Sequence, residues 1–447
     1  MNSEWNMVRL VDVASIRNGA GVKQEFFADH GTPLARVTNF TDSSIDLEDS
    51  VKVHPGHANR WKHHRLDAGD ALVATVGSWP PNWASVVGKA VLVPNTAAGA
   101  IQNQNTCCIR ALSGKANQRF VYYTLKSEEF AHYAANSASG SANQARLPVS
   151  KLEEFTFNLP PLKEQQSIAG LLGSLDDRIT HLRETNATLE AIAQALFKSW
   201  FVDFDPVRAK MEGRTPEGMD EATAALFPDG FEESALGLVP RGWRFMPIGE
   251  AVESVGGATP DTKNSAYWEP AIHCWTTPKD LSGIPSPVLL DTERKLSDEG
   301  LAKIGSGLLP VGTLLLSSRA PIGYLALAQV PLAINQGYIA MLAGGLLPPL
   351  FMLFWCQQNM ETIKGRANGS TFMEISKKAF RPIPALVPPP EVVAVFIDIA
   401  ESMFARLVEN EKQAQTLATL RDTLLPRLIS GQLRLPEVTV KLEESAA

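Results

Sequence analysis

The chain has 447 residues, which is long enough for two or three domains with cores of their own. Its composition, with 45% hydrophobic and 20% charged residues, is that of an ordinary globular protein, and no run of about 18 apolar residues is present to span a membrane. The net charge of −7 argues at first against nucleic-acid binding, and the four cysteines show no CxxC spacing that would predict a zinc site.

The first block of the chain, residues 1–159, is expected to be a mixed α/β domain. It opens with MNSEWNMVRL, which has no apolar signal segment or cleavage site, so secretion is not expected. Alternating strands such as ALVATVG and a helical spacing at 121–134 follow. Adjacent Cys107 and Cys108 suit a strand in a reduced, cytoplasmic protein. Polar loops with interleaved aromatic residues lie at 36–42, 59–65, 78–85 and 101–107.

A long helix with a heptad pattern is predicted over residues 160–201. Its apolar residues recur in steps of four and three, and a row with a period near 3.5 needs a facing helix to bury it. Asn186 interrupts this row, and a buried amide there would control the register between two helices. On the heptads alone, an ordinary amphipathic core helix is an equal alternative. The predicted seam residues are Ile168, Leu172, Leu175, Ile179, Leu182, Leu189 and Leu196.

Residues 202–240 are rich in Pro, Gly and acidic residues without a sustained period, which predicts an acidic linker with short helical pieces. The block at 241–388 then repeats the plan of the first one, since GWRFMPIGEAVE resembles EWNMVRLVDVAS. A second heptad helix is predicted over 389–430, followed by an acidic tail at 431–447. The seam residues of this helix are Phe396, Ala400, Met403, Leu407, Ala414, Leu417 and Leu424.

The chain contains the same passage twice at a constant offset. Gly140 matches Gly369 and Ile168 matches Ile397, in each case 229 residues further on. A repeat of this length indicates a duplicated module and not a solenoid with short periods. We therefore expect the two long helices, each of which follows a globular block, to pack on one another.

The charge is distributed unevenly along this repeat. Residues 1–150 carry +2 (14 Lys and Arg against 12 Asp and Glu), and residues 241–381 also carry +2 (13 against 11). By contrast, 151–240 carries −8 (8 against 16) and 382–447 carries −3 (6 against 9). This pattern permits phosphate contacts by the blocks and protein contacts by the helices and linker.

No catalytic motif is present in the sequence. The stretch Trp79-Pro80-Pro81-Asn82-Trp83 holds the residues of an amino-methyltransferase loop in the wrong order. The P-loop, HExxH and GxSxG patterns are absent, and no glycine-rich turn suits S-adenosylmethionine. We therefore expect a non-catalytic chain that binds no metal or cofactor of its own.

The polar loops have two interpretations. For any single loop, a solvated turn anchored by its aromatic residues is favoured. The alternative is that the loops deliver Arg, Lys, Asn and Gln side chains to phosphates and to base edges in the DNA major groove. The repeat favours DNA, because two homologous blocks with unlike loops are what two different half-sites require. The candidate DNA-binding residues are Arg36, Asn39, Arg60, Lys62, His63, His64, Arg65, Ser78, Asn82, Asn103, Gln104, Thr277, Lys279, Ser317, Ser318, Arg319, Asn335, Gln336 and Ser370.

Several stretches carry a family resemblance. LPPLKEQQSIAGLLGSLDDRI, KSWFVDFDPVRAK, TPEGM, LFPDGFEESALGLVPRGW and the closing LRDTLLPRLISGQLRL resemble the specificity subunit of Type I restriction-modification systems. TPKDLS, LLPVGTLLLSSRAPIGYLAL and AINQGYIA look like its second target-recognition domain. The resemblance covers nearly the whole chain. One departure is VPPPEVV at 387–393, where the family usually has PP-x-x-EQ.

The resemblance implies an α+β fold in which two α/β target-recognition domains are separated by a long antiparallel helical coiled coil, internally repeated. The recognition domains would be 1–159 and 241–388. A helix over 163–201 would be about 58 Å long. It could hold two DNA-reading surfaces about a helical turn of duplex or more apart, about 34–36 Å.

The resemblance also implies partners. These are double-stranded DNA, two methylation subunits and restriction (translocase) subunits, with S-adenosylmethionine, ATP and Mg²⁺ bound by the partner subunits. This chain would choose a bipartite, asymmetric target, and its acidic helices and linker would dock the partners.

Two other functions stay open on the residues alone. One is an enzyme with a degenerate nuclease or methyltransferase site, which binding of S-adenosylmethionine by the isolated chain would favour. The other is a coiled-coil protein-interaction scaffold without sequence-specific DNA binding. Salt dependence separates this scaffold from a DNA-binding protein, because phosphate contacts release counterions.

Overall fold

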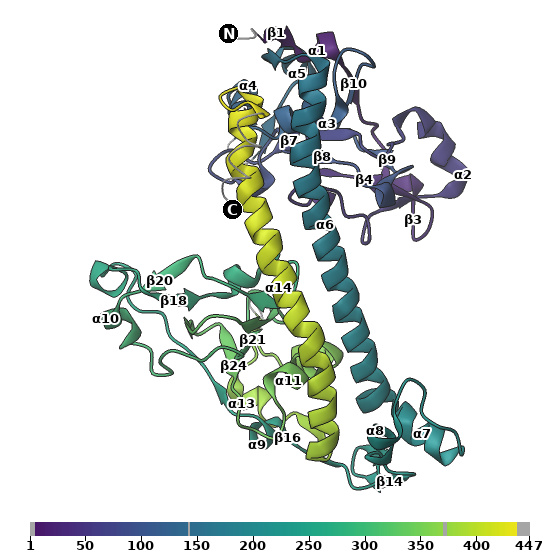
Figure 1. Cartoon of the computed structure of the whole chain (residues 1–447), viewed down its shortest axis with the longest axis vertical. Coiled ribbons are helices and arrows are strands. Elements are labelled where there is room, and N and C mark those ends of the chain that lie inside the picture. Colours follow the sequence, from purple (N-terminus) through teal and green to yellow (C-terminus); the bar gives the residue numbers. More distant parts are fainter. Residues whose placement is uncertain (1–4, 142–143, 370–372, 436–447) are drawn as a thin grey trace. The chain divides into compact units, whose positions relative to one another are not determined.

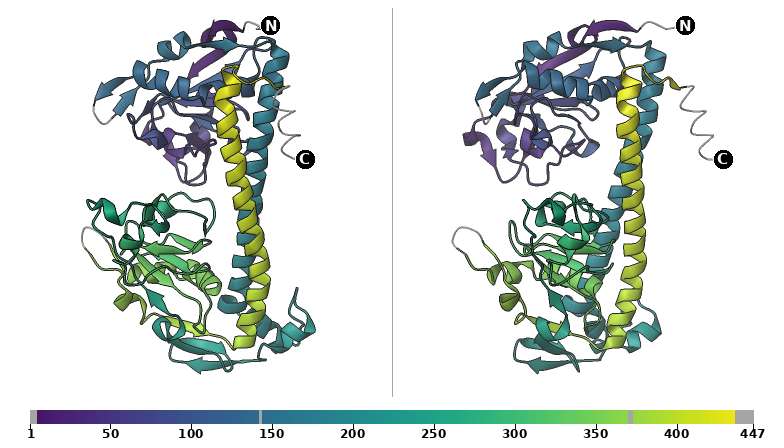
Figure 2. Two further views of the ribbon diagram at one scale, coloured as in Figure 1. Left: turned by 60° about the vertical axis from the view of Figure 1, so that its left-hand side comes forward. Right: turned by 90° about the vertical axis from the view of Figure 1, so that its left-hand side faces the viewer.

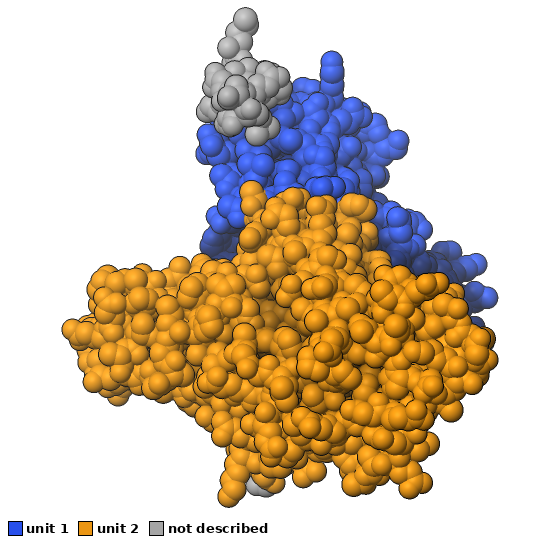
Figure 3. Space-filling model, turned by 60° about the horizontal axis from the view of Figure 1, so that its bottom comes forward, with its two compact units in different colours: residues 1–178, 417–447 blue, residues 179–416 orange. Residues whose placement is uncertain are grey.

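The computed structural model describes residues 5–141, 144–369 and 373–435. The chain divides into two compact units, which Figure 3 colours separately: Met1–Arg178 with Leu417–Ala447, and Ile179–Thr416. Two long helices, α6 (Leu162–Lys198) and α14 (Pro390–Ile429), contribute residues to both units. The predicted domains set these helices apart from the blocks, whereas each block shares a hydrophobic core with segments of both helices.

The first unit is built on two four-stranded sheets. One is antiparallel, in the order β2 (Ala14–Asn18), β10 (Thr106–Ala111), β6 (Ala71–Ala74) and β8 (Ala90–Leu92). The other has the order β3 (Phe27–Ala28), β5 (Lys52–Val53), β4 (Thr32–Ala35) and β9 (Ile101–Gln102), with β4 and β9 parallel.

Two smaller sheets and five helices complete this unit (Figure 1). The strand pair is β1 (Asn6–Arg9) with β13 (Thr156–Leu159), and the three-stranded sheet is β11 (Ser139–Ser141), β12 (Gln144–Arg146) and β7 (Val76–Gly77). The helices are α1 (Leu10–Val13), α2 (Pro55–Ala58), α3 (Gln118–Leu125), α4 (Glu128–Ser137) and α5 (Val149–Glu154).

The second unit repeats this plan. Its five-stranded sheet has the order β17 (Ser254–Val255), β24 (Tyr338–Met341), β21 (Leu314–Ser317), β22 (Leu325–Ala328) and β19 (Val288–Leu289). Its three-stranded sheet is β20 (Arg294–Leu296), β18 (His273–Thr276) and β23 (Leu332–Ile334), and β16 (Arg244–Pro247) pairs with β25 (Pro384–Val387). The helices are α9 (Ile248–Ala251), α10 (Asp298–Leu301), α11 (Pro349–Gln358), α12 (Met360–Gly365) and α13 (Lys377–Phe380).

The duplication is visible in the topology of the two units. The order β2-β10-β6-β8 corresponds to β17-β24-β21-β22, and the parallel pair β4–β9 corresponds to the parallel pair β18–β23. A glycine meets a carbonyl closely at the same place in both: a Cβ on Gly19 would lie 1.9 Å from the Asn103 oxygen, and one on Gly257 1.8 Å from the Ile334 oxygen. The predicted fold class, with an internal repeat and long helices, is confirmed.

The two long helices lie side by side within each unit and run antiparallel (Figures 1 and 2). In the first unit, Arg421 Nη1 lies 2.7 Å from Asp176 Oδ1 and Arg434 Nη1 lies 2.5 Å from Glu164 Oε1. In the second unit, the Phe197 and Phe396 rings meet at 5.6 Å between centroids.

The residues of the predicted seam are buried or half-buried. Those buried are Ile168, Leu172, Ile179, Leu182, Phe396, Ala400, Leu407, Ala414 and Leu424. Those half-buried are Leu175, Leu189, Leu196, Met403 and Leu417. The second helix carries two polar residues in its seam, Asn410 and Arg421, which break the apolar pattern. In the described part of the chain, no helix, α6 and α14 included, combines the length and the apolar character needed to cross a membrane.

The segment after α6 is a folded part of the second unit. It contains a π-helical turn (Ser199–Asp203), α7 (Asp205–Met211), α8 (Glu221–Ala225) and a hairpin of β14 (Phe231–Ser234) and β15 (Gly237–Pro240). Val207 and Phe227 are buried in one core with Trp243. The expected short helices are therefore present, but the hairpin and the shared core were not anticipated from the composition.

Candidate nucleic-acid interface

Four predicted residues of the second unit line one hollow of about 350 Å³: Thr277, Lys279, Arg319 and Asn335. They come from the loops that follow β18, β21 and β23. Because β18 and β23 are parallel neighbours, the loops after them leave the same edge of the sheet. Pro278, Ser282, Ala320 and Tyr324 complete the lining. The fold thus gathers an ammonium, a guanidinium, a hydroxyl and an amide on one concave surface.

A network of short contacts holds Lys279 in place. The Thr277 N–H donates to Asp280 Oδ2 at 2.7 Å, and Asp280 Oδ1 accepts from the Glu293 N–H at 2.9 Å. The Lys279 ammonium lies 2.7 Å from Glu293 Oε2 and is exposed. The hydrogen bond that Lys279 donates to this carboxylate, followed by the charge of the carboxylate, raises the pKa of Lys279 above its ordinary value. Lys279 therefore presents a full positive charge at neutral pH.

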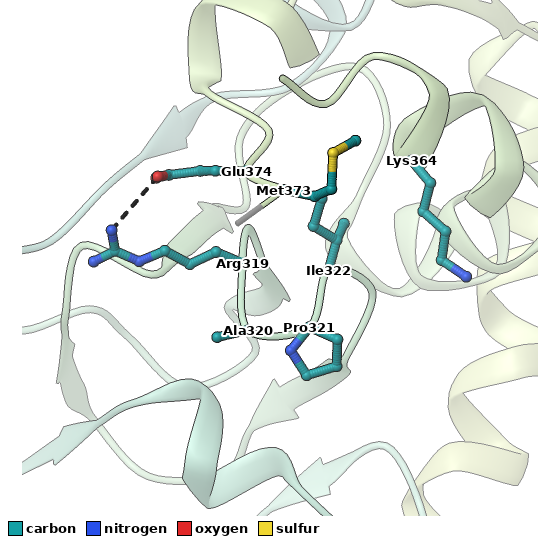
Figure 4. A pocket seen from close by; sticks show the side chains of 7 residues that line it. All are labelled: Arg319, Ala320, Pro321, Ile322, Lys364, Met373 and Glu374. Carbon is teal, nitrogen blue, oxygen red and sulfur yellow. Dashed lines mark hydrogen bonds and ion pairs between the residues drawn. The ribbon is translucent and has the colours of Figure 1, made fainter. Parts of the chain in front are cut away.

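Arg319 lines both this hollow and a second hollow of about 570 Å³. Figure 4 shows the second one. The guanidinium of Arg319 pairs with Glu374 at 3.5 Å between Nη1 and Oε2. Lys364 lines the same hollow on the side away from Arg319, and Pro321 and Met373 contribute apolar lining. Two cations and one carboxylate thus surround a surface that is large enough for a nucleotide.

The remaining candidate residues of the second unit form hydrogen bonds within the unit or are buried. Asn335 Oδ1 accepts from the Gly337 N–H at 2.8 Å, and Gln336 Oε1 accepts from the Thr259 hydroxyl at 2.6 Å. Ser317 and Ser318 are 0% and 3% exposed, because strand β21 ends inside the core at Ser317 and the backbone of Ser318 is bonded on both sides, to Gly337 and Ile375. We therefore withdraw these two serines from the candidate interface. Ser370 lies outside the described residues.

In the first unit, Arg17 on strand β2 holds the turn at Asn59–His64 by hydrogen bonds to its backbone. Arg17 was not among the candidates. Its guanidinium donates to the His63 oxygen at 2.8 Å and to the Arg65 oxygen at 3.0 Å. Arg65 itself donates to the Gly99 oxygen at 2.7 Å, and His64 Nδ1 lies 3.1 Å from the Asn18 oxygen. Arg65 and His64 therefore have structural roles, because their side chains are bonded to backbone oxygens of the same unit.

Of the other side chains of this turn, Trp61 packs inward against Phe26, whereas Lys62 and His63 are exposed. Arg60 lies over the Phe26 ring at 5.0 Å from its centroid. An arginine held on a ring keeps its donors available for phosphate. Arg60 and Lys62 are therefore the strongest candidates for phosphate contacts in this turn.

The neighbouring loops of the first unit are also partly structural. Arg36 N–H donates to Asn39 Oδ1 at 3.0 Å, and the Arg36 guanidinium lies 6.0 Å from the Phe27 centroid. Asn103 is buried, and its amide donates to Gln104 Oε1 at 2.6 Å. Gln104 is exposed. In the loop after β7, Ser78 donates to the oxygen of the exposed Asn82 at 2.9 Å.

Three residues that the sequence did not single out support the candidate side chains: Arg17, Glu293 and Glu374. Each acts through a partner at least 14 residues away, such as Glu293 on Lys279. A pattern read along the chain contains no signal for such a pair.

Two observations on the described residues bear on metal binding and on thiol chemistry. Among these residues, no group of three or more His, Cys, Asp or Glu side chains could hold a metal ion. Burial raises the pKa of the Cys107 and Cys108 thiols to about 12, so neither is a nucleophile at neutral pH. The geometry instead supports contact with a polyanion.

Comparisons with known proteins agree with this picture. The model of a family described as Type I restriction modification DNA specificity domain matches residues 2–191 and 240–418. The Type I restriction enzyme HindI specificity subunit of Haemophilus influenzae is 26% identical over 428 residues, which cover 86% of this chain and 90% of that protein. The MjaIX specificity subunit of Methanocaldococcus jannaschii is 34% identical over 173 residues, covering 38% and 40%. The crystal structure of the S subunit of a Type I restriction-modification system from M. genitalium shares the fold, with a TM-score of 0.53 over 96% of both chains and 17% identity.

Proposed function

The chain belongs to the Type I restriction modification DNA specificity domain family, and from this premise we propose that it reads a bipartite, asymmetric DNA target for partner subunits. Membership supports sequence-specific DNA recognition. The finer proposal is that each unit reads one half of the target, and that adenine methylation and cleavage are carried out by partners.

The observation that carries this proposal is the hollow in the second unit. Lys279 supplies a cationic donor for phosphates, and Arg319, Asn335 and Thr277 supply further donors and polar side chains beside it. Arginine can also donate two hydrogen bonds to guanine in the major groove. The first unit carries other side chains on the same frame, such as Arg36 where the second has Thr277. Two unlike surfaces on like frames suit two unlike half-sites.

We propose that the partners are two methylation subunits and the restriction subunits of the same system. S-adenosylmethionine, ATP and Mg²⁺ would then be bound by those subunits, and this chain would bind no cofactor. The β14–β15 hairpin supports a docking role, because Leu236 and Leu238 are exposed beside the acidic residues Glu232 and Glu233. An exposed apolar pair with a charged rim is typical of a protein contact.

The test is to express the chain with its methylation subunits and to map N6-methyladenine across a genome. We expect one asymmetric motif in two parts with a fixed spacer. Exchange of residues 241–381 for those of a relative should change one part alone. The methylation subunits without this chain are the control and should modify no defined motif.

A stable complex that methylates no defined motif would contradict the proposal. The chain would then be a coiled-coil scaffold for its partners. Binding of DNA that is insensitive to salt would point the same way, because phosphate contacts make affinity fall steeply with salt concentration.

A further inference from the structure

Each unit presents a row of three side chains across three adjacent strand segments, at the same place in the repeated frame. In the first unit, Arg146 on β12 lies opposite Ser139 on β11 and Val76 on β7. In the second unit, Glu374 is bridged in the same way to Asn368 on one side and to Arg319 on the other.

Hydrogen bonds next to the rows show that the two positions are equivalent. The Leu147 N–H donates to the Thr75 oxygen at 2.9 Å, and the Ile375 N–H donates to the Ser318 oxygen at 3.0 Å. Leu147 and Ile375, which follow Arg146 and Glu374 in the chain, are both buried. Because side chains alternate along an extended chain, the row side chains point to the opposite face, away from the core.

The rows are accessible. Ser139, Arg146 and Asn368 are exposed, while Arg319 and Glu374 are half-buried. Residues directly opposite on paired strands have Cβ atoms about 4.5–5.5 Å apart, so each row forms one continuous strip of side chains. The major groove admits a two-stranded β-ribbon, and two of the three residues of each row lie opposite one another on such a pair of segments.

The two strips differ in chemistry. The second unit presents an amide, a carboxylate and a guanidinium, from Asn368, Glu374 and Arg319. The amide and the guanidinium are groups that pair with adenine and guanine edges respectively, while the carboxylate holds the guanidinium. The first unit presents a hydroxyl, a guanidinium and a valine from Ser139, Arg146 and Val76, which suit guanine flanked by the methyl group of thymine. The arginine thus comes from β12 in one unit and from the loop after β21 in the other.

We propose that these two rows carry the base-reading side chains of the two units, and that Arg146, at the position of Glu374, supplies the guanidinium that Arg319 supplies in the second unit. This inference rests on the proposed function and names residues within it. Glu374 is a positioning residue for Arg319, since the 3.5 Å ion pair orients the guanidinium beside the hollow of Figure 4. In the first unit, the hairpin that carries Arg146 is braced by Trp79, whose Nε1 donates to the Ser141 oxygen at 2.9 Å.

The experiment compares Arg146→Ala and Arg319→Ala in the complex with its methylation subunits. We expect Arg146→Ala to relax one base position in one half of the methylated motif, and Arg319→Ala to relax one position in the other half. For each, the preference for the correct base should fall roughly 5- to 150-fold, as for the loss of a bidentate contact. Arg9→Ala, an exposed arginine of the first unit paired with Asp12, is the matched control and should leave the motif unchanged.

A second measurement separates base reading from phosphate contact. The purified complexes are titrated with duplexes that carry the wild-type motif or single-base substitutions of it. Arg146→Lys keeps the charge but loses the fork of donors, so it should relax the same position while keeping most of the affinity. An equal loss of affinity for all duplexes in the Arg146→Ala complex would mean a phosphate contact and would overturn the inference.

The possible failures are distinguishable. If the wild-type complex methylates no defined motif, the proposed function itself fails. If it has a motif that neither Arg146→Ala nor Arg319→Ala alters, the function stands and the rows are not base-reading elements. If Arg146→Ala lowers the melting temperature of the chain, the comparison of duplexes with the Arg146→Lys complex decides instead.

Discussion

Asn410 on α14 donates a 2.9 Å hydrogen bond from its amide to the side-chain oxygen of Asn186 on α6, inside the second unit. The two residues are 0% and 3% exposed, and the Asn186 amide donates in turn to the Leu407 oxygen at 3.2 Å. Two buried amides that face each other in apolar seams form this bond in one alignment of the helices, although Asn410 Oδ1 itself has no hydrogen-bond partner among the described residues. A shift by one heptad would bury each amide against an apolar seam residue, so the pair specifies the register.

Asn186→Ala should destabilise the chain by about 1–3 kcal/mol, because the Asn410 amide would be left buried without its acceptor. The double variant Asn186→Leu/Asn410→Leu should lose less than the sum of the two single leucine variants, since it removes both polar groups. Chemical denaturation of the four proteins in a double-mutant cycle measures this coupling. Additive effects would show that the amides do not act as a pair.

Arg421→Ala, in the first unit, should lower the stability of the chain more than Asn186→Ala does. It removes the partner of Asp176, which also accepts a 2.7 Å hydrogen bond from the Tyr123 hydroxyl in a largely buried setting. Breaking such a pair costs about 3–5 kcal/mol, because the remaining charge is uncompensated. Arg9→Ala, which breaks an exposed ion pair, is the control and should not change the unfolding midpoint. Equal midpoints for both variants would contradict this assignment.

Leu182→Glu should disrupt the helix pair. Leu182 is 2% exposed, and an unpaired carboxylate there costs several kcal/mol by burial. Ile192→Glu on the same helix, at a position that is 52% exposed, should be tolerated. Thermal melting followed by circular dichroism distinguishes them. A comparable loss of melting temperature in the two variants would argue against the seam.

Lys62→Ala and Lys279→Ala should each weaken DNA binding and reduce the slope of log K against log salt by about one. The reason is that each of these exposed ammonium groups would release about one counterion on binding a phosphate. Arg214→Ala, an exposed arginine paired with Glu212 in the folded segment after α6, is the charge-matched control. Fluorescence anisotropy at several salt concentrations gives the slopes, and unchanged slopes would remove both residues from the phosphate contacts.

Cys107 and Cys108 should resist thiol reagents in the native chain at pH 8. Burial raises the pKa of both thiols to about 12, so the reactive thiolate is scarce until the chain unfolds. Cys274 is half-buried and should be labelled first. Mass spectrometry after timed alkylation gives the order, and early labelling of Cys107 would show that its strand opens readily.

The two long helices were predictable because a heptad pattern reports a local geometry. The point at which the first helix ends was not predictable. It ends through a π-helical turn and then Phe204, which adopts a positive φ of 58° that a heptad pattern does not indicate. The polar seam residues Asn410 and Arg421 were missed for a related reason: each interrupts the apolar period and is explained only by a partner on the other helix.

The candidate site was predictable in part. Lys279 and Arg319 lie in loops whose composition suggests contact with DNA, but their shared hollow depends on the parallel pairing of β18 and β23. Ser317 looks like a loop residue, yet its hydroxyl donates to the Pro321 oxygen and accepts from the Tyr324 N–H, both at 2.8 Å. Whether a polar residue is exposed at the end of a strand is decided by the neighbouring strands.

The turns at Asn103 and Asn335 also bear on how such a protein acquires a new target. In both, the amide oxygen holds the backbone two residues on, through the Asn105 and Gly337 N–H groups, so the turn keeps its shape without help from the exposed side chains beside it. Substitutions at the exposed Gln104 and Gln336 then leave these turns intact. A lineage can therefore drift through many side-chain combinations at small cost in stability, and a randomised library at these positions should yield mostly folded proteins.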